Sequence, residues 1–425
     1  MVVLCLNMVS TPYDVIGRIN KDVDDSSQKI LNFFVQMLKI RAVNPRGGGG
    51  GEHERADFIQ EFMKNQGFQV KRVDVNDDEN GGVTRSNLSA SIEGVDSSRT
   101  LWLISHMDTV PEGSLDLWDS DPFEPQVRDG RIIARGSEDN GQSLVASLFA
   151  LRELTLFDVR LPFNVGVWFV ADEEAGSKYG IKHLLAHNYF GKNDIVVVPD
   201  SGSPDGKDIE IAEKSLLWLK ITTTGKQVHA SLPRKGINST RIGMRYALEI
   251  DEFLHKKYDA ADPLFNEPLS TFEPTKKETN VANVNTIPGL DVQYFDCRVL
   301  PRYSLDDVIE NVKSTAEVYK KKYNCNISVG IEQRDDAGPA TSEDSEVAKL
   351  LAKAIETMSN KRPRYVGIGG QTVGNLFRKA GIPTAVWSTI DEVAHEPNEY
   401  CKISNLLNDT KVFAALPLMA MSGTP

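Results

Sequence analysis

Imidazole and carboxylate side chains follow four separate apolar runs of this sequence. Two imidazoles and several carboxylates form the ligand set of a site in which two metal ions assist a hydrolysis. Any one of these groups alone indicates little, because a lone His-x-Asp or Glu-Glu pair is commonly a cap or a solvated surface. The runs, each with the groups that follow it, are Leu101–Ile104 with His106 and Asp108, Phe163–Val170 with Glu173 and Glu174, Ile195–Val198 with Asp200, and Pro383–Trp387 with His395.

The apolar runs are predicted to be strands of one sheet that brings these groups together. They are short and rich in β-branched residues, which is typical of strands buried on both faces. Between Leu88 and Ile209 such runs alternate with helical patterns, notably over Gly141–Leu154, which favours an α/β layer with a mostly parallel central sheet. In open α/β sheets, reactive groups gather beyond the carboxyl ends of the strands. We therefore expect one crevice to hold both histidines and the carboxylates.

Two helices and a glycine run precede this layer. Asp24–Lys39 has apolar residues at helical spacing, and Glu52–Gln66 is predicted to be a second helix that ends near Gly67. The run Gly47–Gly51 lies between them. It is interpreted as a flexible linker, since Gly-rich runs behave as mobile coil, and a loop that flanks the crevice is the alternative.

The pattern changes after Glu213, where a second domain is predicted. Its expected elements follow the order β-α-β-β-α-β of a ferredoxin-like unit. Because the metal-type residues stop at Asp200 and resume at His395, residues 214–334 are interpreted as an insertion. Residues 1–213 and 335–425 then form the catalytic domain. The expected elements of the insertion are Ser215–Thr223, Thr240–Lys257, Asn280–Asn285, Asp291–Val299, Leu305–Tyr323 and Asn326–Gln333.

The composition is typical of a soluble protein of two domains. A chain of 425 residues is too long for one core of ordinary size. The formal net charge of −12, without a Lys/Arg cluster, argues against a nucleic-acid partner. Cys5, Cys297, Cys325 and Cys401 lack Cys-x-x-Cys spacing, so we expect neither a disulfide framework nor a thiolate metal site. The run Val2–Val9 lacks the flanks of a signal peptide, no later run could span a membrane, and a cytoplasmic location is expected.

Five motifs occur together in the order found in one known family. With GKQVHAS and NVNTIPG in the inserted unit, the sequence resembles the co-catalytic zinc amidohydrolases and metallopeptidases. That family includes acetylornithine deacetylase, succinyl-diaminopimelate desuccinylase, aminoacylases and glutamate carboxypeptidases. The resemblance covers most of the chain from about Ile30 onward. The motifs are HMDTV (His106–Val110), RGSEDNG (Arg135–Gly141), ADEEAGSKYG (Ala171–Gly180), PDSG (Pro199–Gly202) and the late His395.

The resemblance implies two Zn²⁺ ions per chain, for which Co²⁺ or Mn²⁺ could substitute. Asp108 would accept the ring N–H of a ligating histidine. Glu173 would be the general base for attack of metal-bridging water on an amide carbonyl. Relatives also carry a cis peptide bond at the position of Asp139–Asn140. The ligands would be His106 for one zinc, His395 for the other, Asp139 as the bridge, and Glu174 and Asp200 as terminal carboxylates.

In the inserted unit, the resemblance implies a lid. His229 matches a histidine that often reaches across a dimer to hydrogen-bond the tetrahedral oxyanion. Asn285 matches a substrate-contacting asparagine, and Arg298 matches a position that binds the substrate's carboxylate, with a strand-end ion pair as the alternative. Gly369 and Gly370 lie in a loop whose backbone N–H groups commonly contact that carboxylate, with a simple turn as the alternative. We therefore expect a homodimer formed through this unit.

Two departures from the family pattern leave the substrate open. Many relatives have Lys-Gly shortly after the bridging aspartate, where this chain has Asn140-Gly141-Gln142. Many also carry an aspartate in the loop aligned with 370–374, and this chain has none there. Neither position is a metal ligand, so both departures concern the substrate rather than the reaction.

The expected protein is an α/β enzyme with a zinc-peptidase-like catalytic domain and an inserted ferredoxin-like α+β domain for lid and dimer contacts. Its expected function is hydrolysis of the amide bond of an N-acyl amino acid or short peptide next to a free carboxylate. That description covers deacylases, desuccinylases and carboxypeptidases. A dipeptidase or aminopeptidase on the same site is the alternative. A catalytically silent binding protein is disfavoured, because every expected ligand and the base are present.

Overall fold

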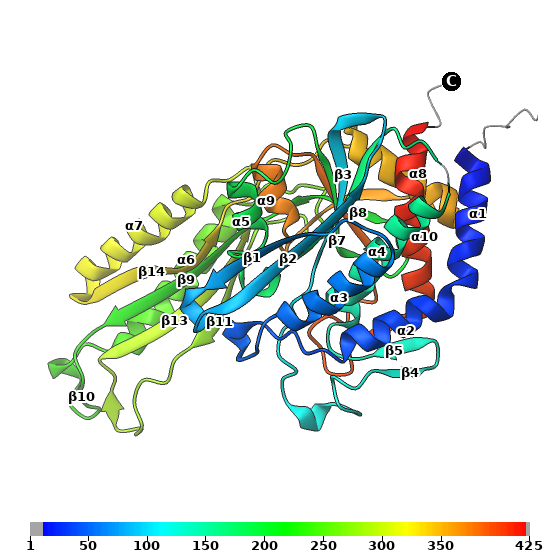
Figure 1. Cartoon of the computed structure of the whole chain (residues 1–425). Coiled ribbons are helices and arrows are strands. Elements are labelled where there is room, and N and C mark those ends of the chain that lie inside the picture. Colours follow the sequence, from blue (N-terminus) through cyan, green and yellow to red (C-terminus); the bar gives the residue numbers. More distant parts are fainter. Residues whose placement is uncertain (1–11, 158, 422–425) are drawn as a thin grey trace, which may run out of the picture. The chain divides into compact units, whose positions relative to one another are not determined.

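The computed structural model describes residues 12–157 and 159–421, which form two compact units (Figure 1). One unit comprises the described residues of 1–211, 341–365 and 372–425, and the other comprises 212–340 and 366–371. The segment 366–371, which lies outside the expected insertion, thus belongs to the second unit. The run Val2–Val9 and Cys5 lie outside the described residues.

The first unit is built on an eight-stranded mixed sheet. The four expected strands are all present as β3, β6, β7 and β16, and they pair in parallel at its centre. Antiparallel pairs flank them. His106 lies opposite Val170 in the ladder of β3 and β6, so the residues that follow both strands leave the sheet at the same level. In spatial order the strands are β1 (Lys71–Asp77), β2 (Val83–Ile92), β6 (Phe163–Val170), β3 (Asp96–His106), β7 (Ile195–Ser203), β16 (Thr384–Thr389), β8 (Asp208–Glu213) and β15 (Arg364–Ile368).

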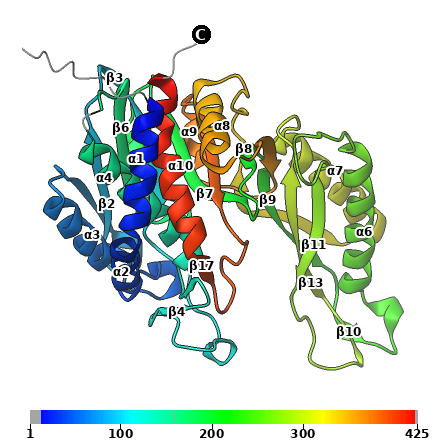
Figure 2. The ribbon, with the colours of Figure 1, turned by 90° about the vertical axis from the view of Figure 1, so that its right-hand side faces the viewer.

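Helices cover the sheet of the first unit. Trp102 and Ile104 of β3 pack against Ile181 of α5 and Phe377 of α9, and α4 packs against β3 and β6. The long helix α10 lies along α4 and α1 (Figure 2). The helices are α1 (Pro12–Asp25), α2 (Ser27–Leu38), α3 (His53–Asn65), α4 (Ser143–Leu156), α5 (Ile181–Ala186), α8 (Glu346–Ser359), α9 (Gly374–Lys379) and α10 (Ile403–Met421).

The predicted start of the helix Asp24–Lys39 is wrong. Two helices meet there, because Ser26 leaves the helical region with φ −88° and ψ 0°. The apolar residues on which the prediction rested, from Ile30 to Leu38, all lie in α2 and form its buried stripe.

The second unit has the predicted β-α-β-β-α-β order, with one strand misplaced. The predicted strand Asn280–Asn285 is wrong, because the second strand is Thr271–Lys277. This edge strand buries only Phe272, so it lacks the alternation of a half-buried strand. Asn280 Oδ1 instead accepts the backbone N–H of Val281 at 2.8 Å, and such a local bond from side chain to backbone favours irregular backbone. The elements are β9 (Ser215–Thr224), α6 (Ser239–Lys257), β11 (Thr271–Lys277), β13 (Leu290–Val299), α7 (Leu305–Tyr323) and β14 (Asn326–Asp335).

The sheet of the second unit has the order β11-β13-β9-β14, and α6 and α7 lie on one of its faces (Figure 2). Leu219 and Phe295 of the sheet pack with Tyr246 of α6 and Val312 of α7 in the core. Two small sheets complete the described part of the chain. Their strands are β10 (Val228–His229) with β12 (Thr286–Ile287), and β4 (Gln126–Arg128), β5 (Arg131–Ile133) and β17 (Tyr400–Lys402). No helix in residues 12–157 and 159–421 is long and apolar enough to cross a membrane.

Candidate active site

The carboxylate of Asp139 lies between the imidazoles of His106 and His395. Its Oδ1 is 2.9 Å from His106 Nε2, and its Oδ2 is 3.0 Å from His395 Nε2. His106 ends β3, Asp139 belongs to the irregular turn Ser137–Gln142 before α4, and His395 follows β16 on a loop. The Asp139–Asn140 peptide bond is cis, as the family resemblance implied. One carboxylate thus presents an oxygen to each imidazole, which is what a ligand bridging two cations must do.

A second carboxylate accompanies each imidazole. Asp200 Oδ1 is 3.5 Å from His106 Nε2, and Glu174 Oε2 is 3.3 Å from His395 Nε2. Asp200 lies in a bulge of β7, where residues 199–201 stand opposite the single residue Trp387 of β16. A bulge turns the side chain away from the regular alternation of the strand. The structure therefore brings together all five residues that were predicted to bind metal.

The charges of this cluster fit a pair of cations. Burial and the neighbouring Asp200 raise the pKa of Glu173 well above its usual value, and burial and Asp139 raise the pKa of Glu174 to about 7. Glu174 Oε1 is buried and makes no hydrogen bond within the described part of the chain. Two groups of three residues could each hold a metal ion, because one ligand atom from each residue lies within 4.8 Å of the other two. The groups are His106, Asp139 and Glu174, and His106, Glu173 and Asp200. A divalent cation would relieve the carboxylate repulsion and coordinate the unpaired oxygen.

Asp108 contacts both the histidine and the glutamate pair. His106 Nδ1 lies 2.9 Å from the backbone oxygen of Asp108 and 3.6 Å from its Oδ1. The ring N–H of His106 thus donates to the backbone oxygen of Asp108, whereas the prediction was that it donates to the Asp108 carboxylate. That carboxylate instead accepts the backbone N–H groups of Glu173 at 3.0 Å and Glu174 at 3.2 Å. Asp108 therefore ties the turn that carries both glutamates to the strand that carries His106.

The turn that carries the glutamates is also held by a buried ionic network, which the sequence did not predict. Arg85 forms a two-pronged bond with Glu52 and contacts Asp77 and Asp172, each at 3.2 Å. All four side chains are nearly or fully buried. Asp172 has a left-handed backbone (φ +64°) and directly precedes Glu173. The motif containing Asp172 was recognised, but its arginine lies in another strand, so sequence spacing could not connect the two.

Asn44 is a second residue that the sequence did not predict. Its Nδ2 donates to Asp108 Oδ2 at 2.7 Å and to Asp172 Oδ1 at 3.3 Å. The glycine run that follows it is a bonded turn, so its interpretation as a flexible linker is wrong. Gly47 N and Gly49 N both donate to Asn44 O, and a Cβ on Gly49 would lie 2.0 Å from the Val43 oxygen. The glycines allow the close backbone packing that positions Asn44.

We predict that Arg85→Met lowers the free energy of unfolding by about 3–5 kcal/mol, because three buried carboxylates would lose the cation that pairs with each of them. Urea unfolding of the metal-free protein measures the effect. Arg99→Met is the matched control, since Arg99 pairs with Glu346 at the surface and such pairs contribute about 0–1 kcal/mol. Equal losses for the two variants would contradict the role given to the buried network.

The departure at Asn140-Gly141-Gln142 has a structural counterpart. A Cβ on Gly141 would lie 2.3 Å from the Gly136 oxygen and 2.7 Å from Cε2 of Phe34, so only glycine fits there. Gln142 Nε2 donates to Thr389 O at 2.8 Å and to Asp409 Oδ2 at 3.0 Å. Gly141 and Gln142 therefore hold the Asp139 turn against the rest of the first unit. This chain has no charged side chain at the position where many relatives have lysine.

The residues predicted to contact substrate fall into two groups within the second unit. Exposed His229 on β10 lies opposite Thr286 of β12, and Ala230 N donates to Asn285 O, so His229 and Asn285 are neighbours. Arg298 pairs with Asp296 through two nitrogens at 2.7 and 3.0 Å, as in the ion-pair alternative.

The same arginine also reaches the predicted glycine loop. Arg298 Nη1 donates to Gly369 O at 3.2 Å, and Gln371, which follows Gly370, donates to the oxygens of Lys214 and Asp335. These bonds anchor the loop within the second unit. A substrate carboxylate at Arg298 would have to share its guanidinium with Asp296.

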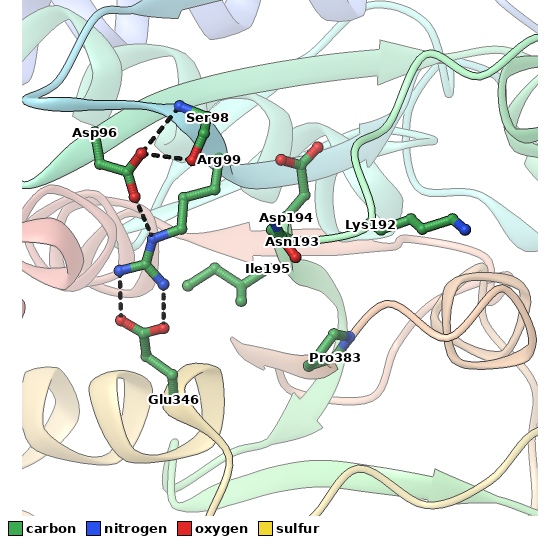
Figure 3. Close-up of a pocket in the computed structure, with 9 residues that line it drawn as sticks. All are labelled: Asp96, Ser98, Arg99, Lys192, Asn193, Asp194, Ile195, Glu346 and Pro383. Atoms are coloured by element: carbon green, nitrogen blue, oxygen red, sulfur yellow. Dashed lines mark hydrogen bonds and ion pairs between the residues drawn. The ribbon is translucent and has the colours of Figure 1, made fainter.

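A separate hollow of about 390 Å³ lies at the opposite, amino-terminal ends of the central strands (Figure 3). Asp96 begins β3, Ile195 begins β7, and Pro383 precedes β16. Three of the charged groups of this hollow pair with one another, because Arg99 binds both Asp96 and Glu346, and Asp194 accepts hydrogen bonds from Thr100 N and Trp102 Nε1. It therefore offers no comparable reactive cluster.

Comparisons with known proteins show which family this chain resembles. Residues 102–418 match the family model described as peptidase family M20/M25/M40. An uncharacterized metallohydrolase of Methanococcus maripaludis is 39% identical over 89% of this chain and 95% of its own. A succinyl-diaminopimelate desuccinylase of Nautilia profundicola is 27% identical over 87% of this chain and 93% of its own. The solved structure of a dipeptidase of Saccharomyces cerevisiae has a TM-score of 0.75 at 16% identity and covers 96% of this chain and 99% of that one.

The fold and the family match together define a metal-dependent hydrolase of the α/β class. The chain belongs to peptidase family M20/M25/M40, as the sequence resemblance indicated. It is therefore a hydrolytic enzyme that acts on amide bonds.

Proposed function

We propose that this enzyme cleaves the amide bond of an N-acyl amino acid or short peptide next to a free carboxylate. The observation that carries the proposal is the Asp139 carboxylate between two imidazoles, each with a second carboxylate beside it. Two cations would be held, one by His106, Asp139 and Asp200, and the other by His395, Asp139 and Glu174. Imidazole and carboxylate ligands suit Zn²⁺ and also accept Co²⁺ or Mn²⁺. When bound, the cations polarise the scissile carbonyl and lower the pKa of water.

The protein's own groups move the proton and hold the geometry. Glu173 takes a proton from the attacking water and passes it to the leaving nitrogen. Its raised pKa in the buried site is consistent with a group that can both accept and return a proton. Asp108 keeps Glu173 in place through the backbone N–H group at 3.0 Å. Glu174, the next residue, points to His395 and serves as a ligand.

Substrate class is tested with matched pairs of compounds. The desuccinylase relative at 27% identity supports an N-acyl amino acid. Zinc-loaded enzyme is given N-succinyl and N-acetyl amino acids and unblocked dipeptides, each also as its α-carboxamide. We expect turnover of the N-acyl acids and at least ~10-fold lower kcat/KM for the carboxamides, because a recognition site for a carboxylate would be left unpaired. Equal cleavage of acid and carboxamide would contradict the free-carboxylate requirement. Cleavage of unblocked dipeptides alone would favour the peptidase alternative.

Metal binding is expected to strengthen as pH rises. Hydrogen bonds with Asp139 and Glu174 raise the pKa of His395 to about 10. Burial alone would lower the pKa of His106, but nearby Asp200 raises it well above its usual value. Both imidazoles are therefore expected to be doubly protonated in the metal-free protein near neutral pH, and a cation must displace one proton from each. Calorimetric zinc titrations between about pH 6 and about pH 8, in buffers of different ionisation enthalpy, should show proton release and tighter binding at the higher pH. Affinity independent of pH would contradict this expectation.

We further propose that the predicted insertion, about residues 214–334 within the second unit, serves as a lid and forms a homodimer. His229 lies in this unit and the metal-type residues lie in the other. The terminal strands β11 and β14 of its sheet have one partner each in the sheet order, and an edge strand can pair with its two-fold mate. His229 would donate a hydrogen bond to the oxyanion of the reacting carbonyl.

Replacing His229 tests this role. His229→Ala is expected to lower kcat by about 100-fold or more with metal content unchanged, because an oxyanion donor acts in the transition state. His255→Ala is the control, since His255 is an exposed histidine of the same unit that bonds its own helix. Loss of bound metal in His229→Ala would contradict the role.

A mixing experiment distinguishes action across a dimer from action within one chain. Glu173→Ala and His229→Ala are each expected to be nearly inactive, and they are mixed under conditions that exchange subunits. If His229 acts across the dimer, each mixed dimer regains one working site. An inactive mixture after confirmed exchange, or a monomer in solution, would contradict the trans role.

A further inference from the structure

Two segments far apart in the sequence are joined beside the site. Residues 134–139 lead to Asp139, and residues 391–399 contain His395. The antiparallel pair of β5 and β17 places Ile133 opposite Tyr400, and Ala134 N then donates to Glu399 O at 3.0 Å. Beyond this point the two segments leave the sheet, and side chains take over their connection.

Glu399 binds the first of these segments. Its carboxylate accepts the backbone N–H groups of Gly136, Glu138 and Asp139 at 2.9, 2.8 and 3.0 Å. It also accepts a bond of 2.7 Å from Arg135 Nη1, and the side chain is fully buried. A carboxylate with four such bonds is strongly held, because bonds to charged acceptors are stronger than neutral ones. Glu399 therefore fixes the backbone at the residue that would bridge the cations.

Glu138 binds the second segment in return. Its two carboxylate oxygens accept the backbone N–H groups of Asp391 and Val393, each at 2.6 Å. Arg135 adds a bond of 3.2 Å from Nη2 to the backbone oxygen of His395. Each segment thus sends one buried glutamate to the backbone of the other.

His395 needs such support. Its side chain is 55% exposed, whereas that of His106 is 2% exposed, so packing does not orient it. Its backbone has φ +66°, a left-handed conformation that a residue other than glycine keeps only when its surroundings hold it. The loop bonds made by Glu138 and Arg135 supply that support.

We propose that Glu138 and Glu399 are a reciprocal pair of positioning residues that set the spacing between the Asp139 carboxylate and the His395 imidazole. The inference deepens the proposed function and rests on it. The spacing matters because a cation must fit between the carboxylate and the imidazole. Neither glutamate belongs to the groups of possible ligand atoms in the described residues. Both act through the backbone that carries a ligand.

The test is zinc binding by the full chain, without substrate. Metal-free wild type, Glu399→Gln and Glu138→Gln are titrated with Zn²⁺ by calorimetry, and the Co²⁺ forms are compared by their visible absorption spectra. A glutamine would direct an N–H group at backbone donors that now meet an oxygen. We expect zinc affinity for the weaker of the two sites to fall ~10–100-fold in each variant, with a changed Co²⁺ spectrum. Glu396→Gln, on the same loop but exposed, should bind zinc like wild type.

The outcomes separate this inference from the proposed function. If wild type binds two zinc ions and both glutamine variants bind them with unchanged affinity, the positioning role is overturned while the proposed function stands. If wild type binds no zinc at the site, both fail. If the variants unfold more easily but keep wild-type zinc affinity and Co²⁺ spectra, or if both fail to fold, the glutamates are structural only and the inference is overturned.

Discussion

Glu173→Gln is expected to lower kcat by about 10²–10⁴-fold while zinc content stays at the wild-type level. Glutamine keeps the shape of the side chain but cannot take a proton from water, so the loss falls on the chemical step. Burial and Asp200 raise the pKa of Glu173, which suits proton transfer near neutral pH. Steady-state kinetics on the best substrate, together with metal analysis of the same samples, measures both quantities.

Glu174→Gln is the matched comparison, because the two glutamates are neighbours of the same size. Glu174 Oε2 lies 3.3 Å from His395 Nε2, so its replacement should weaken metal binding first. Activity in Glu174→Gln should then recover in part at high zinc concentration, and activity in Glu173→Gln should not. If both variants lose metal alike, or both keep it alike, the division of roles between these residues is wrong.

Asp139→Asn is expected to abolish turnover and to remove at least one zinc ion. Both oxygens of Asp139 face imidazoles, at 2.9 and 3.0 Å, and an asparagine would direct an N–H group at one of them. The loss of zinc affinity should exceed the ~10–100-fold that is typical when only a supporting residue is changed. Titration of metal-free protein with zinc measures the affinity and the number of sites.

Asp116→Asn is the control for this substitution, because Asp116 is an exposed aspartate in the same unit. It should keep two zinc ions and full activity. Two tightly bound zinc ions in Asp139→Asn would contradict a bridging role. A single zinc ion in the fully loaded wild type would contradict the proposal of a metal pair.

The sequence alone determined the four central strands of the first sheet and the identity of the chemical groups that follow them. The apolar runs that became β3, β6, β7 and β16 are short, β-branched and bounded by polar residues, so local pattern is enough to identify them. Parallel strands in one sheet expose their carboxyl ends along one edge, so residues that follow separate strands are expected to meet. His106 and Glu174 can therefore be assigned to one site from the sequence alone.

Predictions from the local sequence pattern were wrong where the conformation of a segment depends on residues far away in the sequence. Gly47–Gly51 has the composition of a linker, yet its backbone bonds to Asn44 and packs against Val43. The edge strand β11 buries only Phe272, so its pairing with β13 left no alternation to detect. For β11 the deciding contact is its pairing with β13, which no short window of sequence contains. The glycine turn bonds within its own loop, and that loop is anchored to the distant Thr109 through Val43 and Asn44.

Tertiary structure also decided how the site is held. Arg85 contacts Asp172, and Glu399 contacts the backbone at Asp139, across separations of 87 and 260 residues. Arginine and glutamate are most often solvated surface residues, so their types alone gave no sign of burial. A buried charge is stable only where partners converge on it from several segments, and that convergence is a property of the folded chain. The reactive groups could thus be recognised from local sequence, whereas the residues that position them could be recognised only in three dimensions.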